Sequence, residues 1–141
     1  MNNNSIVTYR GVAHPWLCDA MGHLNTRHYV GMFDDAGLHF LNELGFNWTH
    51  IQESAWGWVD ARNLLEYHLE VTTAALVTIR SCVRRLGNKS TTLFHEMRST
   101  ETDELHATME VILVCFDKNV RKSMSIPSEF RTRAEKYLSE S

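Results

Sequence analysis

The sequence predicts an α+β fold in which an antiparallel sheet wraps around one long helix. Residues 26–44 place apolar side chains at a spacing of about 3.6 residues, which is typical of a helix with a buried stripe. From residue 56 onward, shorter apolar segments alternate with turn residues, which is typical of strands in a meander. A chain of 141 residues is long enough for one sizeable core and too short for two, so we expect a single domain over residues 1–141.

The chain is expected to begin with a frayed tail over residues 1–5 and a first strand over Ile6–Val12. β-Branched and aromatic residues favour a strand in this segment, and Pro15 ends it because proline cannot donate to a strand ladder. The long helix then begins at Asn25 or Thr26, whose short side chains can accept hydrogen bonds from the unpaired amides of the first turn.

The long helix is expected to end at Gly45, since glycine readily takes the left-handed conformation that terminates helices. A helix as apolar as this one is usually surrounded by the rest of the protein. Its stripe is expected to contain Tyr29, Phe33, Ala36, Phe40 and Leu44, widened by Val30, Met32, Leu38 and Leu41.

Four strands are expected after the long helix, at 56–71, 76–86, 90–99 and 105–116. Residues 47–54 lack a firm period, although a short helical turn can form there. The run Val111–Phe116 is apolar on both faces, which is typical of a central strand covered on both sides. A terminal helix is expected to start at Pro127. Its apolar stripe contains Phe130, Ala134, Tyr137 and Leu138.

Composition and charge exclude several classes of protein. The formal net charge of −3 gives no general attraction for nucleic acid. No apolar run approaches the ~20 residues that span a bilayer, and the polar start of the chain lacks the basic and apolar regions of a signal peptide. Three cysteines without a CxxC pair argue against a disulfide framework and for a reducing compartment. We therefore expect a cytoplasmic protein that binds neither nucleic acid nor membrane.

The turn before the long helix carries the most informative residues. Residues 19–25 read Asp-Ala-Met-Gly-His-Leu-Asn and are followed by Tyr29 and, within the helix, by Asp34. This order resembles the signature of hotdog-fold acyl-CoA thioesterases of the 4-hydroxybenzoyl-CoA thioesterase type, in which the block commonly reads Asp-x-Asp-x-Met-Gly-His-Val-Asn-Asn. The sequence departs from that pattern at Leu17, which replaces the first Asp, and at Thr26, which replaces the second Asn.

The resemblance implies a hotdog fold and hydrolysis of an acyl-CoA thioester to a free carboxylic acid and CoA. In that family two protomers commonly join their sheets edge to edge, so the resemblance also implies a homodimer or homotetramer with active sites between protomers. No cofactor is expected. The loose cluster of Cys18, Asp19, His23 and His28 matches no standard zinc pattern, so no metal is expected either.

Asp19 is the predicted catalytic residue. Thioester hydrolysis needs a nucleophile or a base, together with donors for the oxygen that becomes negative in the tetrahedral intermediate. Asp19 can attack the carbonyl or deprotonate water, and the sequence does not separate these routes. The amides around residues 24–26 can supply the donors, and the resemblance places the donor at Thr26. Asp19 can instead merely cap the turn.

His23 and Asn25 complete the predicted catalytic set. His23 can hydrogen-bond the thioester, position water or bind a pantetheine amide, or it can be a half-buried histidine satisfied by the backbone. Asn25 can orient water or cap the helix. Asp34 is the reserve catalytic candidate, because some hotdog enzymes of another branch use a helix carboxylate. Otherwise Asp34 is expected to bond within the fold.

The predicted substrate-binding residues are Tyr29, Trp58, Arg84, Arg85, Lys89 and Ser90. The hairpin around residues 87–90 resembles the segment that often borders the CoA site in the family, and its cations can meet the CoA phosphates. A solvated hairpin is the alternative. Aryl, branched and quaternary-ammonium acyl groups all suit the aromatic residues near the expected pocket, since a cation can be held over tryptophan faces. The rival functions are a hotdog dehydratase or hydratase acting on acyl thioesters and a binding module without turnover.

Overall fold

The computed structural model describes residues 4–139, so part of the expected tail, residues 1–3, lies outside the described residues. Ser5 is only 4% exposed, and the Arg80 guanidinium donates to its hydroxyl oxygen at 3.0 Å, so the prediction of a frayed tail is wrong at this residue. The elements are β1 (Ile6–Val12), the 3-10 turn η1 (Pro15–Leu17), α1 (Thr26–Glu43), α2 (Trp48–Glu53), β2 (Trp56–Tyr67), β3 (Leu76–Leu86), β4 (Ser90–Ser99), β5 (Leu105–Asp117), β6 (Lys122–Ser123) and α3 (Ser128–Glu135).

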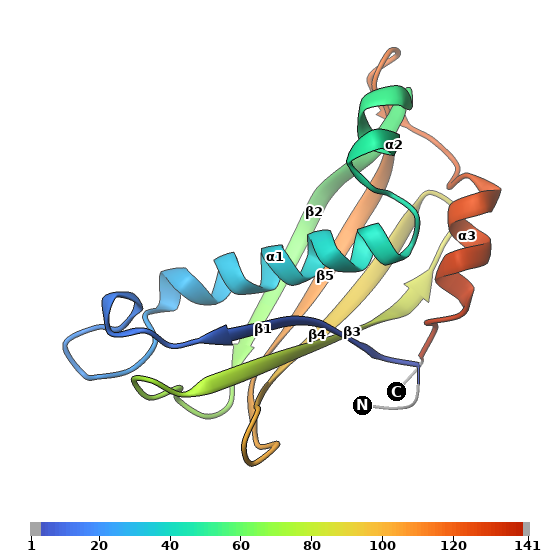
Figure 1. Cartoon of the computed structure of the whole chain (residues 1–141). Coiled ribbons are helices and arrows are strands. Elements are labelled where there is room, and N and C mark those ends of the chain that lie inside the picture. The colour runs from blue at the N-terminus through green and yellow to red at the C-terminus, as the bar shows by residue number, and fades with distance from the viewer. Residues whose placement is uncertain (1–3, 140–141) are drawn as a thin grey trace.

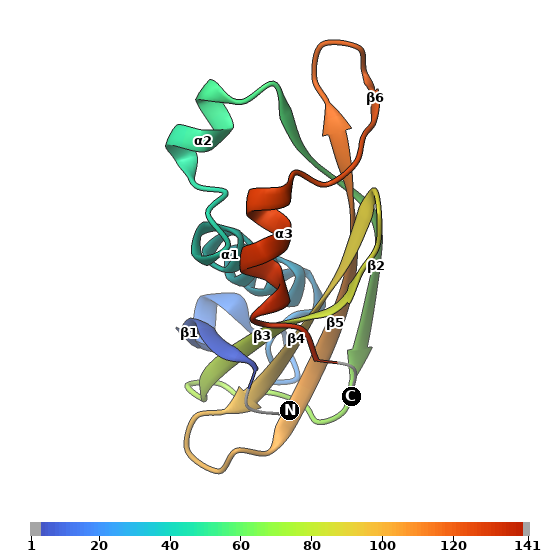
Figure 2. The same cartoon turned by 90° about the vertical axis from the view of Figure 1, so that its right-hand side faces the viewer.

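The six strands form an antiparallel sheet in the order β1–β3–β4–β5–β2, and the short β6 pairs with β5. Figure 1 shows α1 lying across this sheet, and Figure 2 shows the sheet curling around one side of it. The expected α+β architecture, a sheet wrapped around one long helix, is confirmed. The two edges of the sheet are β1 and β2, which lie far apart because the other strands separate them.

Helix α1 forms where the apolar spacing predicted it. It begins after Asn25, whose side-chain oxygen accepts from Arg27 N at 3.1 Å, and the chain turns away at Gly45, where φ is +90°. The predicted stripe is confirmed, because each of its members is buried: Tyr29, Phe33, Ala36, Phe40 and Leu44. The wider stripe is wrong at Val30 and Leu38, which are 45% and 57% exposed. One side of α1 is therefore open in the single chain.

Strand β2 is shorter than the sequence predicted. It ends at Tyr67 instead of residue 71, because His68 N and Leu69 N both turn to the carbonyl oxygen of His106, at 2.8 and 3.1 Å. The Val71 carbonyl is used elsewhere, since Leu24 N donates to it at 2.7 Å. This last hydrogen bond joins the end of the β2 segment to the start of α1.

Strand β5 differs from the prediction of a strand covered on both faces. It lies between β4 and β2, so it is central in the sheet, and its inward side chains Val111, Leu113 and Cys115 are buried. The outward side chains between them are only half-buried. The sheet therefore has a covered concave face and a convex face that is partly open.

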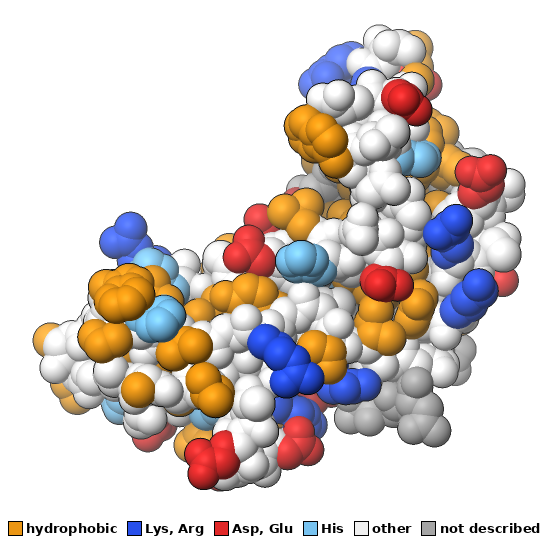
Figure 3. All heavy atoms as spheres, viewed as in Figure 1, with side chains coloured by type: hydrophobic (Ala, Val, Ile, Leu, Met, Phe, Trp, Pro, Cys, Tyr) orange, Lys and Arg blue, Asp and Glu red, His pale blue; other side chains and the backbone are white. Residues whose placement is uncertain are grey.

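The two short helices close the ends of the fold. Helix α2 confirms the expected helical turn, and it is held by Lys118, whose ammonium group donates to the carbonyl oxygens of Ile51 at 2.7 Å and Ser54 at 3.2 Å. Figure 3 shows the surface hollowed between α1 and the projecting α2. Helix α3 starts after Pro127 as predicted and ends at Glu135, before the last two members of the predicted stripe. Within residues 4–139, no helix is long and apolar enough to cross a membrane.

Candidate active site

The turn that precedes α1 is closed by its own backbone. Asp19 N donates to the His23 carbonyl at 2.9 Å, and Gly22 N donates to the Asp19 carbonyl at 3.0 Å. Gly22 has a φ of +77°, a left-handed conformation that glycine takes without steric cost. The Gly22 carbonyl in turn accepts from Thr73, both from its amide and from its hydroxyl, at 3.0 Å each. The turn is thus fastened to the segment that leads into β3.

The carboxylate of Asp19 is divided between two roles. Its Oδ1 atom accepts from Met21 N at 2.9 Å and from His23 N at 3.4 Å, which is the capping role that the sequence left open. Its Oδ2 atom makes no hydrogen bond to any residue of the described range 4–139. Asp19 therefore holds its turn with one oxygen and presents the other to solvent or to a ligand.

The amides at the start of α1 are not equally available. Leu24 N donates to the Val71 carbonyl at 2.7 Å, and Asn25 N donates to the Leu17 carbonyl at 2.9 Å. Thr26 is the first residue of the helix, so its amide has no acceptor within the helix. Of the amides predicted as donors at residues 24–26, only that of Thr26 remains open, and it has the partial positive charge of a helix N-terminus.

Asp19 and Thr26 line one cavity of about 380 Å³. His23 and Tyr29 also contribute to its walls, as the sequence predicted for residues near the turn. Leu24 adds to the wall from the turn itself, and the other side comes from the end of β2 and the segment after it: Tyr67, His68, Leu69 and Glu70. The sequence did not place this last set at the Asp19 turn, because the segment is brought beside the turn by hydrogen bonds of the folded chain, from Leu24 N to the Val71 carbonyl and from Thr73 to the Gly22 carbonyl.

Tyr29 is a buried aromatic side chain in the wall of this cavity. It is 4% exposed, and its ring meets that of Tyr67 edge to face with a centroid distance of 5.0 Å. Burial raises the pKa of Tyr29, a hydrogen bond with the backbone of Val71 opposes this, and the charges of nearby groups, Asp19 among them, raise it further. The phenol stays protonated at neutral pH, so it can donate a hydrogen bond inside the cavity.

The structure distinguishes the roles that the sequence left open for His23 and Asn25. Asn25 caps α1 through its side-chain oxygen. The His23 imidazole makes no hydrogen bond to another described residue, so it is not satisfied by the backbone. It lines the cavity with both ring nitrogens available for a ligand.

The basic hairpin lies far from this cavity within one chain. The turn that carries Asp19 is fastened beside the start of β3, whereas Lys89 and Ser90 follow the end of β3. Ten residue steps of an extended strand cover about 33 Å. The structure therefore does not bring the predicted phosphate-binding residues together with Asp19 in a single copy of the chain.

The cations of the hairpin also differ in their local partners. Arg84 forms an ion pair with Glu110 at 3.1 Å and stacks over the Phe94 ring at 3.5 Å on the convex face of the sheet. Arg85 is exposed at the end of β3. The carbonyl of Lys89 accepts from Cys115 N at 2.8 Å, and the Ser90 carbonyl accepts from Gly87 N at 2.8 Å. Contact of these four residues with CoA stays a prediction.

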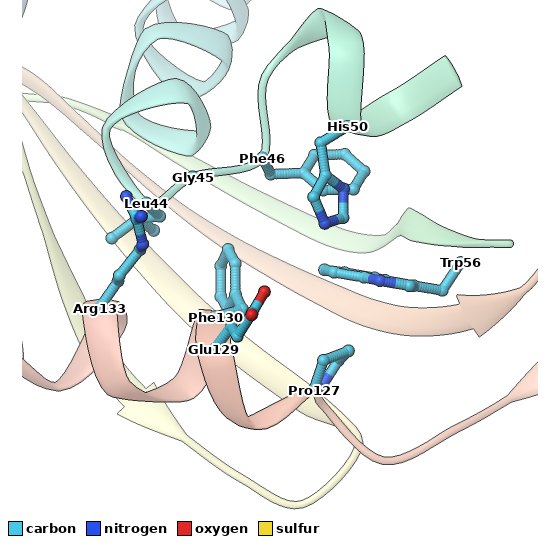
Figure 4. A pocket seen from close by; sticks show the side chains of 9 residues that line it. All are labelled: Leu44, Gly45, Phe46, His50, Trp56, Pro127, Glu129, Phe130 and Arg133. Atoms are coloured by element: carbon cyan, nitrogen blue, oxygen red, sulfur yellow. The ribbon is translucent and has the colours of Figure 1, made fainter. Parts of the chain in front are cut away.

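Trp58 and Asp34 line a different cavity, of about 330 Å³, between α1, α2 and the beginning of β2. A further cavity of about 220 Å³ lies beyond the end of α1. Figure 4 shows its walls, with His50 pointing in from α2, Trp56 lying across from β2 and Phe130 projecting from α3. None of the predicted catalytic residues lines this further cavity.

We compared the chain with models of protein families, with curated proteins and with solved structures. A family model described as the thioesterase-like superfamily matches residues 13–133. The chain belongs to the thioesterase-like superfamily. No curated protein matches the chain. The matched range includes the Asp19 turn, α1 and every strand except β1, so the resemblance noted in the sequence is confirmed at the level of the family.

Solved structures confirm the hotdog fold. The chain is similar to a hypothetical protein of Staphylococcus aureus crystallised in complex with CoA, with a TM-score of 0.86, 18% identity, and coverage of 94% of this chain and 84% of that one. It is similar to a DHNA-CoA thioesterase of the same organism, with a TM-score of 0.78, 19% identity, and coverage of 94% and 88%. A gentisyl-coenzyme A thioesterase has a TM-score of 0.76, 25% identity, and coverage of 89% and 97%.

Proposed function

We propose that this protein is an acyl-CoA thioesterase that hydrolyses a CoA thioester to a carboxylic acid and CoA. The observation that carries the proposal is the pairing of two open groups on one cavity, the Oδ2 atom of Asp19 and the amide of Thr26. An anionic oxygen and a peptide N–H are the two groups that thioester hydrolysis requires. Membership of the thioesterase-like superfamily supports the same reaction.

Asp19 acts on the thioester carbon by one of two routes. In the first, its carboxylate oxygen forms a bond to that carbon and expels the CoA thiolate, and water then hydrolyses the mixed anhydride. In the second, Asp19 takes a proton from water while the water oxygen forms the bond to that carbon, and the tetrahedral intermediate then breaks its C–S bond and expels the CoA thiolate, which takes up the proton. In both routes the carbonyl oxygen becomes negative, and the Thr26 amide donates to it. A thiolate leaves readily, so no dedicated general acid is required.

His23 and Tyr29 are assigned to substrate binding in this cavity. The free nitrogens of His23 suit the amides of the pantetheine arm, and the Tyr29 hydroxyl adds a donor from the buried side. Asn25 acts by fixing the helix start that carries the Thr26 amide. The proposed hydrolysis requires no cofactor.

We also propose that the working molecule is a homodimer joined along β2. This edge strand has open backbone groups and exposed apolar side chains, with Val59 46%, Leu64 40% and Tyr67 52% exposed. Two copies that pair β2 with β2 in antiparallel fashion bring the end of one strand beside the beginning of the other. The Asp19 cavity of one copy then faces the Trp58 cavity of the second copy.

The dimer also gives the basic hairpin a place in the site. The hairpin at residues 87–90 lies at the same end of the sheet as the beginning of β2. In the joined sheet, the hairpin of one copy is therefore at the same end as Asp19 of the other. This arrangement supports contact between Lys89 or Arg85 and the phosphates of a CoA bound at Asp19.

Release of free thiol from a panel of CoA esters, followed with a thiol reagent, tests the proposed function. A thioesterase releases one thiol for each ester consumed. A dehydratase or hydratase changes the acyl group without releasing thiol, and a binding module does neither. The proposal fails if the wild-type protein releases no thiol from any ester of an aryl, branched, straight-chain or cationic acyl group.

A further inference from the structure

The cavity between α1, α2 and the beginning of β2 holds polar groups that the proposed hydrolysis does not use. Its volume is about 330 Å³, enough for a compact acyl group. Most of the wall is apolar and comes from α1 and the concave face of the sheet. Four polar side chains interrupt that wall: His95, Asp34, Asp60 and Lys118.

His95 presents a hydrogen-bond acceptor to this cavity. We assign the hydroxyl proton of Thr8 to the Ile79 carbonyl at 3.4 Å, and in this assignment Thr8 accepts from the Ser81 hydroxyl at 2.7 Å. Ser81 then accepts from His95 Nδ1–H at 2.6 Å. Burial lowers the pKa of His95 to about 4, so the ring is neutral at pH 7 and its Nε2 atom carries a lone pair.

The Nε2 atom of His95 has no partner among residues 4–139, although the side chain is only 1% exposed. It is directed toward Gly37 of α1, where an added Cβ would lie 3.9 Å from it. Gly37 and His95 both line the cavity. An acceptor that opens into the cavity without a partner favours a ligand group that carries a donor or positive charge. Among the described residues, the fully buried side-chain atom without a hydrogen-bond partner is Trp58 Nε1, which leaves one N–H donor open in the same wall.

Two carboxylates border the same cavity without a neutralising partner. Asp34 and Asp60 form no ion pair within the described chain, and both are exposed at its mouth. Burial raises the pKa of Asp34, and the charges of Asp60 and Asp35 raise it further. The ammonium group of Lys118 is already bound to the carbonyls of Ile51 and Ser54. Two carboxylates and one ammonium group therefore border the cavity, which leaves a net negative charge.

Aromatic rings complete the surroundings of a cation. Phe33, Phe46 and Trp58 line the cavity. The Trp58 ring meets Trp56 edge to face at 5.7 Å and lies tilted against Phe130 at 4.8 Å. Packed rings of this kind attract a cation that lies over their faces. The acceptor nitrogen, the unpaired carboxylates and the rings all favour positive charge.

We propose that this cavity is an acyl pocket that selects acyl groups carrying a positively charged nitrogen, either an ammonium or a quaternary ammonium. The inference rests on the proposed function, because the acyl group enters the cavity from a thioester held at Asp19 of a second copy. The rings and carboxylates attract both kinds of cation. The His95 nitrogen adds a hydrogen bond only for an ammonium N–H.

Two matched pairs of CoA esters test the selection by charge alone. Trimethylammonioacetyl-CoA is compared with 3,3-dimethylbutanoyl-CoA, in which carbon replaces the nitrogen, and 3-aminopropanoyl-CoA is compared with butanoyl-CoA. The expected result is a kcat/KM at least tenfold higher for the cationic member of a pair. A preference in both pairs assigns the selection to charge, and a preference confined to the ammonium pair assigns it to His95. No preference in either pair overturns the proposal.

The double variant Asp34→Asn/Asp60→Asn identifies the residues responsible. The ratio of kcat/KM between the cationic and neutral members is expected to fall at least tenfold toward one. Glu101→Gln/Glu104→Gln is the control, because it removes the same charge from an exposed turn between β4 and β5, and it is expected to keep the ratio. An unchanged ratio in the Asp34→Asn/Asp60→Asn variant overturns the assignment.

A binding measurement separates this proposal from the proposed function. Non-hydrolysable thioether analogues of the same two pairs are titrated into the wild-type protein by calorimetry. Tighter binding of a cationic analogue, by at least tenfold, supports the pocket even if no ester is hydrolysed. Equal binding within both pairs contradicts the pocket even if every ester is hydrolysed.

Discussion

At the residue scale, the Asp19 turn shows how much of a site can be predicted from sequence. Asp19 and Gly22 were identified from the sequence, because a short acidic side chain and a glycine suit a tight turn before a helix. The loss of two of the expected amide donors was not predictable. The acceptors that occupy them, Leu17 and Val71, reach the turn only through the folded chain.

Replacement of Thr26 by proline removes the open amide with little change to the helix. Proline is well accepted at the first helical position, and Asn25 before it has an extended ψ of 141°, which suits a residue that precedes proline. The expected result is a fall in kcat of about 10²–10³ for Thr26→Pro. Steady-state thiol release measures it, and Thr26→Ala, which keeps the amide, is expected to remain near the wild-type rate. Equal rates for the two variants would contradict the role of the amide.

The buried His95 makes stability depend on pH. Its pKa is lowered to about 4 in the folded chain from 6.5, so between these values the unfolded chain binds a proton that the folded chain does not. The stability due to neutral His95 is therefore complete above pH 6.5 and is lost as the pH falls toward 4. Between pH 7.5 and pH 5, the wild-type protein is expected to lose about 2 kcal/mol more free energy of unfolding than His95→Gln. Urea titrations at the two pH values measure this, and equal losses would contradict it.

At the scale of elements, sequence periodicity predicted which segments are helical or extended better than it predicted where they end. The stripe of α1 follows from the spacing of its apolar residues. The early end of β2 does not, because it depends on the His106 carbonyl, which takes two amides out of the strand. The half-open convex face of β5 was not predictable either, since a continuous apolar run does not report which of its faces is covered.

The start of α1 is fixed by Asn25. Its side chain accepts from Arg27 N, and loss of such a cap costs about 1 kcal/mol. Asn25→Ala is expected to lower the free energy of unfolding by about that amount, and Asn25→Ser, which restores an accepting oxygen, is expected to recover most of it. Chemical denaturation distinguishes the variants. If Asn25→Ala and Asn25→Ser are equally stable, capping is not the role of this side chain.

At the scale of the whole molecule, the order of the strands decides what a second copy can do. β2 is an edge strand although it is the second of the five long strands along the chain, and the sequence alone gives no sign of this. The Asp19 cavity and the Trp58 cavity lie at opposite ends of β2. Only a partner that pairs in the antiparallel direction brings the two cavities together. The resemblance to a family whose protomers join edge to edge favours the same dimer.

A charge placed on the pairing edge is expected to separate the dimer. Leu64→Lys puts an ammonium group on β2, and lysine on an edge strand opposes pairing. Sedimentation velocity is expected to give twice the chain mass of 16.3 kDa for the wild-type protein and a single chain mass for Leu64→Lys. Val7→Lys on β1, the opposite edge, is the control and is expected to stay dimeric. A dimeric Leu64→Lys protein would contradict pairing through β2, and a wild-type mass of four chains would indicate a tetramer.

Mixing two inactive variants tests whether each site draws on both copies. Gly37→Leu fills the Trp58 cavity, since the position opens toward His95 and has no closer neighbour. If the sites are shared, a mixed dimer of Asp19→Asn and Gly37→Leu contains one site with an intact Asp19 and an intact cavity. Unfolding and refolding the two variants together is expected to restore part of the wild-type rate. If mixing restores no activity, Asp19 and the Trp58 cavity of one site belong to the same copy.

The carboxylate of Asp19 is the central claim, and the rate of thiol release by Asp19→Asn tests it most directly. Asparagine keeps the side-chain oxygen that closes the turn, so the fold is expected to survive, as circular dichroism and the urea midpoint can verify. The account predicts that kcat falls by at least about 10² with any CoA ester that the wild-type protein hydrolyses. A folded Asp19→Asn protein that hydrolyses the ester at the wild-type rate would contradict it.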